Sequence, residues 1–264
     1  LADPIHTKPL IFAALSVAVA FLVRYETIAF AAGIAAATLL FMLSVRAKYS
    51  KIESTMIVLL VPVAFSVAVW VGLNYAIMGD PLYFLRSTYS NLSQVNNAAN
   101  TGAAAVMGQA VPTLAFVWER SAVFMIPLGV MLVFRAIRGQ LLRVDTAALL
   151  ALALSIPAMQ VAMLYQGTSF GWLRFFCYPL MIAAAWLPYE WSVQRASRSS
   201  RWFGPAMLAA FAAFACFIVP VMQNARLAPD EYSAIHYRDS DILEASLLAR
   251  SIAQRLDADL LSRP

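Results

Sequence analysis

The chain has 264 residues, of which 62% are hydrophobic and only 12% are charged, and its formal net charge is +5. Soluble domains contain about 45–50% apolar and about 25% charged residues, so this composition excludes an ordinary soluble domain and predicts an integral membrane protein. The positive charge does not indicate a nucleic-acid partner, because the basic residues are concentrated in short loops between apolar stretches.

Seven apolar stretches follow one another along the chain. A helix that crosses a bilayer needs roughly 20 apolar residues. Strand-like alternation is absent from these stretches and Ala, Leu and Met are frequent, which favours helices over a barrel. The predicted fold is an all-α, polytopic membrane helix bundle with about seven spans and the start of an outer soluble segment. The predicted spans are 9–23, 27–45, 54–78, 121–137, 146–165, 174–191 and 203–222.

The first two stretches meet at a charged tripeptide, Arg24-Tyr25-Glu26, without a Gly or Pro turn. Because the first stretch is short for a full crossing, the pair is predicted to form a helical hairpin or a re-entrant segment. Either arrangement brings Arg24 and Glu26 to the outer third of the membrane, where ionisable residues tend to be functional. The alternative is an Arg–Glu pair that snorkels to the headgroups without a further role.

Basic residues mark one side of the predicted bundle. Nine of them follow the second, fourth and sixth spans, whereas the loops at 79–110 and 166–173 contain only Arg86. Cytoplasmic loops carry the excess of Lys and Arg, so these nine residues predict which loops are cytoplasmic and place the tail after 222 outside. The cytoplasmic loops are predicted at 46–53, 135–145 and 192–202, with Arg46, Lys48, Lys51, Arg135, Arg138, Arg143, Arg195, Arg198 and Arg201.

The outer loop and the tail complete the domain organisation. Gly79-Asp80-Pro81 ends the third span, and the aromatic residues that follow suit a helix at the headgroups. Residues 1–222 are predicted to form the transmembrane bundle. Residues 223–264 are predicted to be an extracytoplasmic amphipathic segment, the start of a soluble domain that is cut off at 264. Its apolar stripe consists of Ile242, Leu243, Leu247, Leu248, Ile252, Leu256 and Leu260.

Side chains suited to ligand binding gather on the predicted outer face. Guanidinium groups bind phosphate oxygens bidentately, and aromatic faces can line sugar or prenyl groups. The alternative is an aromatic belt with snorkelling arginines, although two of the arginines stand alone against apolar helix. No metal-ligand set is visible, and a divalent metal ion stays an open alternative. The candidate substrate-binding residues are Arg24, Tyr25, Glu26, Asp80, Tyr83, Arg86, Tyr89, Trp172, Arg174 and Tyr178.

Three segments, in this order and with this spacing, resemble the GT-C class of membrane glycosyltransferases. The resemblance covers roughly 1–260 and implies an enzyme that uses a polyprenyl-phosphate-linked sugar donor among membrane lipids. The expected location is a bacterial plasma membrane, with the site on the extracytoplasmic face. The segments are FLVRYETIAF (21–30), NYAIMGDPLYFLRSTYSN (74–91) and GWLRFFCYPL (171–180).

The resemblance also implies a mechanism of inverting transfer. A carboxylate deprotonates the acceptor hydroxyl, which attacks the anomeric carbon while polyprenyl phosphate leaves. Arg24 and Arg174, with Arg86 third, are the candidates for stabilising the developing phosphate charge. The family's catalytic carboxylate lies in the first outer loop, upstream of the part matched here. Asp80 is therefore not its counterpart, and the general base is expected upstream of this chain.

Other functions compete with this interpretation. A transporter or flippase for a lipid-linked substrate would have intramembrane charges facing a central pathway and conformations open to each side. An O-antigen ligase-like or polymerase-like enzyme would carry one much larger outer loop between late spans. A purely structural membrane subunit is the remaining alternative. The long outer loop, the outer tail and the lack of internal repeats favour the glycosyltransferase.

Overall fold

A computed structural model describes residues 7–83, 103–195, 200–228, 232 and 247–252 of the chain. Within these ranges the regular structure is entirely helical, and the predicted all-α class is confirmed. The helices are α1 (Thr7–Val23), α2 (Thr27–Ser44), α3 (Tyr49–Met78), η1 (Ala104–Val106), α6 (Ala110–Ser121), η2 (Ala122–Met125), α7 (Ile126–Ile137), α8 (Val144–Tyr165), η3 (Leu173–Phe176), α9 (Tyr178–Arg195) and α10 (Ser200–Met222).

Helix length and composition confirm a membrane bundle. Five helical stretches among the described residues are long and apolar enough to cross a bilayer: 27–44, 49–78, 110–137, 144–165 and 201–222. Many of their large apolar side chains are exposed, as expected where lipid rather than protein is the neighbour. The other two predicted spans correspond to α1, which has only 17 residues, and to α9, which contains Glu190 and Arg195.

The predicted hairpin between the first two helices is confirmed. α1 ends at Val23 and α2 begins at Thr27, so residues 10–45 are not one continuous helix. The Thr27 amide donates to the Arg24 carbonyl (3.1 Å), and the Thr27 hydroxyl donates back to the Ala20 carbonyl in α1 (3.2 Å). These bonds satisfy backbone groups at the turn without Gly or Pro.

The fourth span differs from its predicted bounds. The sequence predicts 121–137, whereas helix runs from Ala110 to Ile137 with a short 3₁₀ stretch, η2, in the middle. Pro127 lies at the start of α7 and has no N–H to donate, so the α-helical ladder is interrupted just before it. Glu119 and Arg120, expected at the membrane entry, therefore lie inside helix.

The first three helices pack through two helix pairs: α1 lies along α3, and α2 lies along α8. Gly33 makes the second pairing possible, because a Cβ added there would lie 2.9 Å from the Ala151 carbonyl oxygen and 2.8 Å from Ser155 Cβ. Close backbone approach at small residues is the usual basis of helix association in membranes. A hydrophobic core lies between α7, α8, α9 and α10. It consists of Leu128, Met131, Leu149, Ala153, Ala183, Phe203 and Met207.

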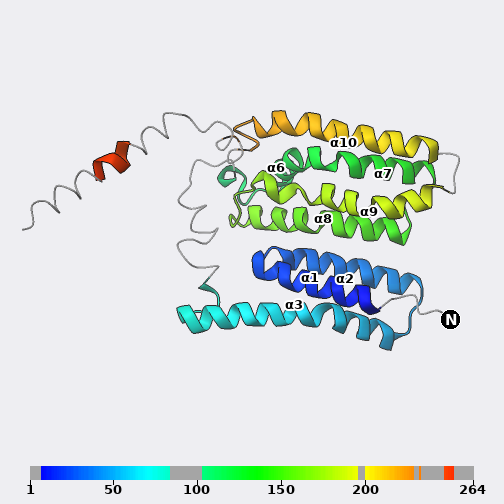
Figure 1. Cartoon of the computed structure of the whole chain (residues 1–264), viewed down its shortest axis with the longest axis horizontal. Helices are drawn as coiled ribbons and strands as arrows, with labels where there is room; N and C mark the ends of the chain where they lie inside the picture. Colours follow the sequence, from blue (N-terminus) through cyan, green and yellow to red (C-terminus); the bar gives the residue numbers. More distant parts are fainter. Residues whose placement is uncertain (1–6, 84–102, 196–199, 229–231, 233–246, 253–264) are drawn as a thin grey trace, which may run out of the picture. The chain divides into compact units, whose positions relative to one another are not determined.

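The connections lie at two opposite ends of these helices (Figure 1). The α1–α2 turn, the C-terminal end of α3 and the connection from α8 to α9 lie at one end, which we call the aromatic end. The α2–α3 and α7–α8 turns lie at the other, which we call the basic end. The sequence predicts that the loops 46–53 and 135–145 lie on one side of the bundle and that the loops 79–110 and 166–173 lie on the other. The grouping of the described connections agrees with this prediction. The orientation of the two ends across the membrane stays a prediction.

The chain divides into two compact units, Leu1–Val219 and Pro220–Pro264. In the second unit, residues 247–252 form a helical segment in which Leu247, Leu248 and Ile252 are all exposed. The other four residues of the predicted apolar stripe lie outside the described residues. The extracytoplasmic role of residues 223–264 stays a prediction.

Candidate functional site

The loop from α8 to α9 builds an aromatic stack at the aromatic end. The rings of Phe170 and Trp172 are stacked with centroids 5.0 Å apart and an interplanar angle of 8°. Trp172 and Phe175 continue the stack at 5.6 Å and 23°. Phe175 is buried and Trp172 is half-buried, so the stack extends from the protein interior toward the surface. Offset aromatic pairs of this kind are favourable beyond the area that they bury.

Two arginines from distant parts of the sequence meet at this stack. The Arg174 guanidinium lies 3.9 Å from the Trp172 ring centroid and 5.6 Å from that of Phe175. The Arg24 guanidinium, from the α1–α2 turn, lies 5.0 Å from the same Phe175 centroid. Both distances to Phe175 are within the range of cation–π attraction. The structure therefore brings the two predicted arginines together on one ring, although about 150 residues separate them.

Glu26 places a carboxylate beside the first of these arginines. Arg24 Nε and Nη2 donate to the two Glu26 carboxylate oxygens, each at 3.4 Å. The Glu26 side chain is 7% exposed and that of Arg24 is 39% exposed. The cluster thus contains one carboxylate, paired with Arg24, and a second guanidinium group, that of Arg174, which is exposed. The local surplus of positive charge suits an anionic ligand group.

Tyr178 belongs to the same neighbourhood. Its ring packs against Phe30 of α2 with centroids 6.2 Å apart, and both Arg24 and Glu26 lie close enough to act electrostatically on its phenol. We call Arg24, Glu26, Trp172, Arg174, Phe175 and Tyr178 the arginine–aromatic cluster. Five of its six members were predicted as site residues. Phe175 was missed, because a Phe in an apolar run gives no signal that two cations lie on its ring.

The remaining predicted residues are placed differently. Tyr25 is half-buried in the turn between its two charged neighbours. Asp80 and Tyr83 lie just after α3, where Asp80 Oδ1 accepts a hydrogen bond from the Leu82 amide at 2.9 Å and fixes a local turn. Arg86 and Tyr89 lie outside the described residues.

Buried polar groups fix the conformation of the loop from α8 to α9. The Ser169 hydroxyl donates to Gln160 Oε1 of α8 (2.6 Å) and accepts from the Gly171 amide (3.1 Å). Gly171 has φ +62°, and a Cβ there would lie 2.3 Å from the Phe116 ring, so only glycine fits. These contacts hold the loop in the conformation that stacks Trp172 on Phe175. Gln160 and Ser169 were not predicted, since isolated polar residues near a helix end give no specific motif.

A second group of charges lies at the basic end. Arg135 is fully buried, and its guanidinium binds Glu190 through Nε (2.8 Å) and Nη2, Thr146 through Nη1 (2.7 Å) and Asp145 (3.3 Å). Glu190 is also fully buried. Arg135 was predicted to lie in the cytoplasmic loop 135–145, and this is wrong. Arg135 lies in the last turn of α7, where its carboxylate partners neutralise it.

The side chains of the arginine–aromatic cluster determine which ligands it can bind. The arginine–aromatic cluster offers two cations, one paired carboxylate and flat ring faces, which together can bind a phosphate next to an apolar or sugar group. No group of His, Cys, Asp and Glu within the described ranges has the arrangement of a metal site. Comparison of the chain with protein-family models, curated proteins and solved structures finds no match.

Proposed function

We propose that this chain is part of a membrane glycosyltransferase of the GT-C type, which moves a sugar from a polyprenyl-phosphate donor to an acceptor at the aromatic end. The observation that carries the proposal is the convergence of Arg24 and Arg174 on the ring of Phe175. A lipid-linked phosphate needs cations for its oxygens and apolar or aromatic surface for its neighbours, and both occur here. Trp172 and Phe175 provide the ring faces that the arginines lie over.

In the proposed reaction the two arginines act on the leaving group. As the bond from the anomeric carbon to the phosphate oxygen breaks, negative charge develops on the departing polyprenyl phosphate. Guanidinium groups already held in place by ring contacts stabilise this charge without reorganising. Glu26 is engaged by Arg24, so its role in the proposal is to position that guanidinium rather than to act as the base. The acceptor's hydroxyl proton passes to a base outside the arginine–aromatic cluster.

Two measurements test the proposal. The first is binding of a polyprenyl-phosphate-linked sugar, and the second is transfer of that sugar by the full-length enzyme. A charge-assisted hydrogen bond is worth about 1.5–3 kcal/mol, so Arg24→Ala and Arg174→Ala should each weaken donor binding and transfer at least about tenfold. Lysine at either position should restore only part of the loss, because it cannot bind phosphate in a bidentate manner. Arg201→Ala, at the basic end, is the matched control and should stay within about twofold of wild type.

Equal losses in the control and in the two cluster variants would contradict the assignment, because the effect would then follow net charge rather than position.

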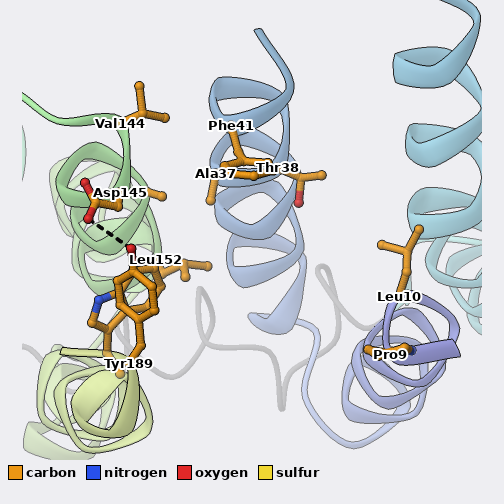
Figure 2. A pocket seen from close by; sticks show the side chains of 11 residues that line it. Pro9, Leu10, Ala37, Thr38, Phe41, Val144, Asp145, Leu152 and Tyr189 are labelled. Carbon is orange, nitrogen blue, oxygen red and sulfur yellow. Dashed lines mark hydrogen bonds between the residues drawn. The ribbon is translucent and has the colours of Figure 1, made fainter. Parts of the chain in front are cut away.

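A flippase for the same class of lipid is the second candidate. A largely apolar cavity at the basic end, between α1, α2, α8 and α9, favours it (Figure 2). Transbilayer movement of the donor lipid in vesicles that lack any acceptor would support the flippase and count against sugar transfer as the primary activity.

A further inference from the structure

Gln160 is a buried amide in α8, and the two ends of its side chain have different surroundings. The residue is 0% exposed. Its Oε1 atom accepts a hydrogen bond of 2.6 Å from the Ser169 hydroxyl, whereas Nε2 has no hydrogen-bond partner among the described residues. A buried donor without a partner lowers stability, and an apolar side chain of similar size would avoid this cost. The stability of the bundle therefore does not explain an amide at this position.

Ser169 connects Gln160 to the backbone of the loop from α8 to α9. Its hydroxyl oxygen accepts a second hydrogen bond, of 3.1 Å, from the Gly171 amide. Gly171 has φ +62°, and a Cβ there would lie 2.3 Å from the Phe116 ring and 3.2 Å from Leu164. The backbone at Gly171 is therefore held between α6 and α8, in a conformation that favours glycine. Through one hydroxyl group, Gln160 is bonded to the residue at which the loop turns.

The turn at Gly171 determines where the next ring and its cation lie. Phe170 and Trp172 flank this glycine in sequence, and their rings stack with an interplanar angle of 8°. The guanidinium group of Arg174 is exposed and lies 3.9 Å from the Trp172 ring centroid. A rotation of the backbone at Gly171 would separate the two rings and move Trp172 together with this guanidinium group. A side chain buried in α8 thus sets the position of an exposed cation.

We propose that Gln160 is a positioning residue of the arginine–aromatic cluster, which acts on Arg174 through Ser169 and Gly171. The inference rests on the proposed function, since it gives Gln160 the task of holding one of the two guanidinium groups that bind the donor phosphate. Bidentate binding of phosphate depends on the orientation of a guanidinium group as well as on its charge. A loop that is loosely held must also be ordered on binding, which lowers affinity.

Substitutions at Gln160 test this role without changing any residue that touches the phosphate. Gln160→Leu removes the acceptor of the Ser169 hydroxyl, and Gln160→Asn keeps the amide but is one methylene too short to reach it. Gln160→Glu keeps an acceptor oxygen at the same reach and removes the amide nitrogen that lacks a partner. Gln166→Leu makes the same chemical change at an exposed residue just after α8 and is the matched control.

The order of the loop is measured first, in the full-length protein without any donor. The Cys177 thiol is half-buried and donates to the Arg174 carbonyl at 3.0 Å, so its reaction with a maleimide reports on the end of the same loop. The labelling rate at Cys177, followed by mass spectrometry of its peptide, should rise about tenfold in Gln160→Leu and Gln160→Asn. It should stay within about twofold of wild type in Gln160→Glu and Gln166→Leu.

Binding is measured second, with undecaprenyl phosphate as the probe, because it has the phosphate and the chain of the proposed leaving group. The Kd should rise about tenfold in Gln160→Leu and Gln160→Asn and should change less than about twofold in Gln160→Glu and Gln166→Leu. A Kd does not depend on how much of the protein is folded, so a role in stability alone would leave it unchanged. The Tm of Gln160→Leu should stay within about 3 °C of wild type.

The outcomes separate this inference from the proposed function. An unchanged Kd in both Gln160→Leu and Gln160→Asn would overturn the positioning role and leave the proposed function standing. Equal effects in Gln160→Leu and Gln166→Leu would also overturn it, because they would not depend on the bond to Ser169. A wild-type protein that does not bind the probe would contradict the proposed function. The labelling rates at Cys177 would then still decide whether Gln160 holds the loop.

Discussion

Arginine occurs in two contrasting environments in this chain, and the contrast is set by contacts rather than by sequence. Arg24 is 39% exposed and lies on a ring beside one carboxylate, whereas Arg135 is fully buried among Glu190, Asp145 and Thr146. Both follow apolar helix in the sequence. The Arg24 neighbourhood was predictable because a charged tripeptide interrupts two spans. The Arg135–Glu190 pair was not, because it joins residues 55 positions apart through the packing of α7 on α9.

The buried pair allows a prediction about stability. Glu190→Gln should lower the free energy of unfolding by about 3–5 kcal/mol, because it leaves the Arg135 charge buried with weaker compensation. The double variant Arg135→Met with Glu190→Leu should be less destabilised than Glu190→Gln, since it removes both charges. Thermal unfolding in a mild detergent, followed by loss of helix signal, measures both.

Arg138→Gln provides the control for that measurement. Arg138 is near Arg135 in sequence, is half-buried, and donates to the Val193 carbonyl at 3.1 Å. Its replacement should cost about 1 kcal/mol or less. If the double variant were the least stable of the three proteins, the pair would be a net source of stability and the prediction would be wrong.

At the scale of helices, the seam between α2 and α8 depends on the absence of a side chain at Gly33. The nearest atom to an added Cβ would be Ser155 Cβ, and the Ala151 carbonyl oxygen belongs to backbone that cannot easily move. A well-packed interior resists even one added methyl group. This contact between α2 and α8 lies between the arginine–aromatic cluster at one end of α2 and the apolar cavity at the other end. It therefore separates the cluster from the cavity.

Gly33→Ala should therefore destabilise the protein, whereas Gly72→Ala should not. Both substitutions gain helix propensity of about 1 kcal/mol, but at Gly72 an added Cβ would meet nothing within 4 Å. We expect the two variants to differ in unfolding free energy by about 1–3 kcal/mol, with Gly33→Ala the less stable. Thermal unfolding of the pair under identical detergent conditions measures the difference. Equal stabilities would mean that α2 and α8 can separate at little cost.

Helices were more predictable from sequence than their ends. The order of all seven stretches follows from hydropathy, and the hairpin at Arg24 follows from a short first stretch. The fourth span was predicted to begin at residue 121, because Glu119 and Arg120 are charged residues of the kind found where a helix enters the membrane. In the structure Arg120 is only 3% exposed, with its guanidinium 3.3 Å from the Phe116 ring centroid. Tertiary packing thus buries a charge inside α6, and a hydropathy pattern cannot show this.

Across the whole molecule, the two ends carry different chemistry. The aromatic end combines two exposed or half-exposed guanidinium groups with stacked rings, and the basic end combines exposed cations with a buried, neutralised network. The sequence predicted that binding residues lie on one side and basic loops on the other, because each span reverses the chain direction. It did not predict the apolar cavity at the basic end, since that cavity arises from how α1 and α2 sit against α8 and α9.

The orientation of these ends across the membrane gives the last prediction. The excess of Lys and Arg predicts that the basic end is cytoplasmic. In a protein with Cys177 and Cys216 replaced by Ser, single cysteines can be introduced at Gln109, at the start of α6, and at Leu142, in the α7–α8 turn. Both positions are exposed. A membrane-impermeant maleimide should label Gln109→Cys in intact cells and should label Leu142→Cys only after lysis. Labelling of Leu142→Cys alone in intact cells would reverse the orientation and place the arginine–aromatic cluster on the cytoplasmic side, where the proposed outer-face sugar transfer would fail.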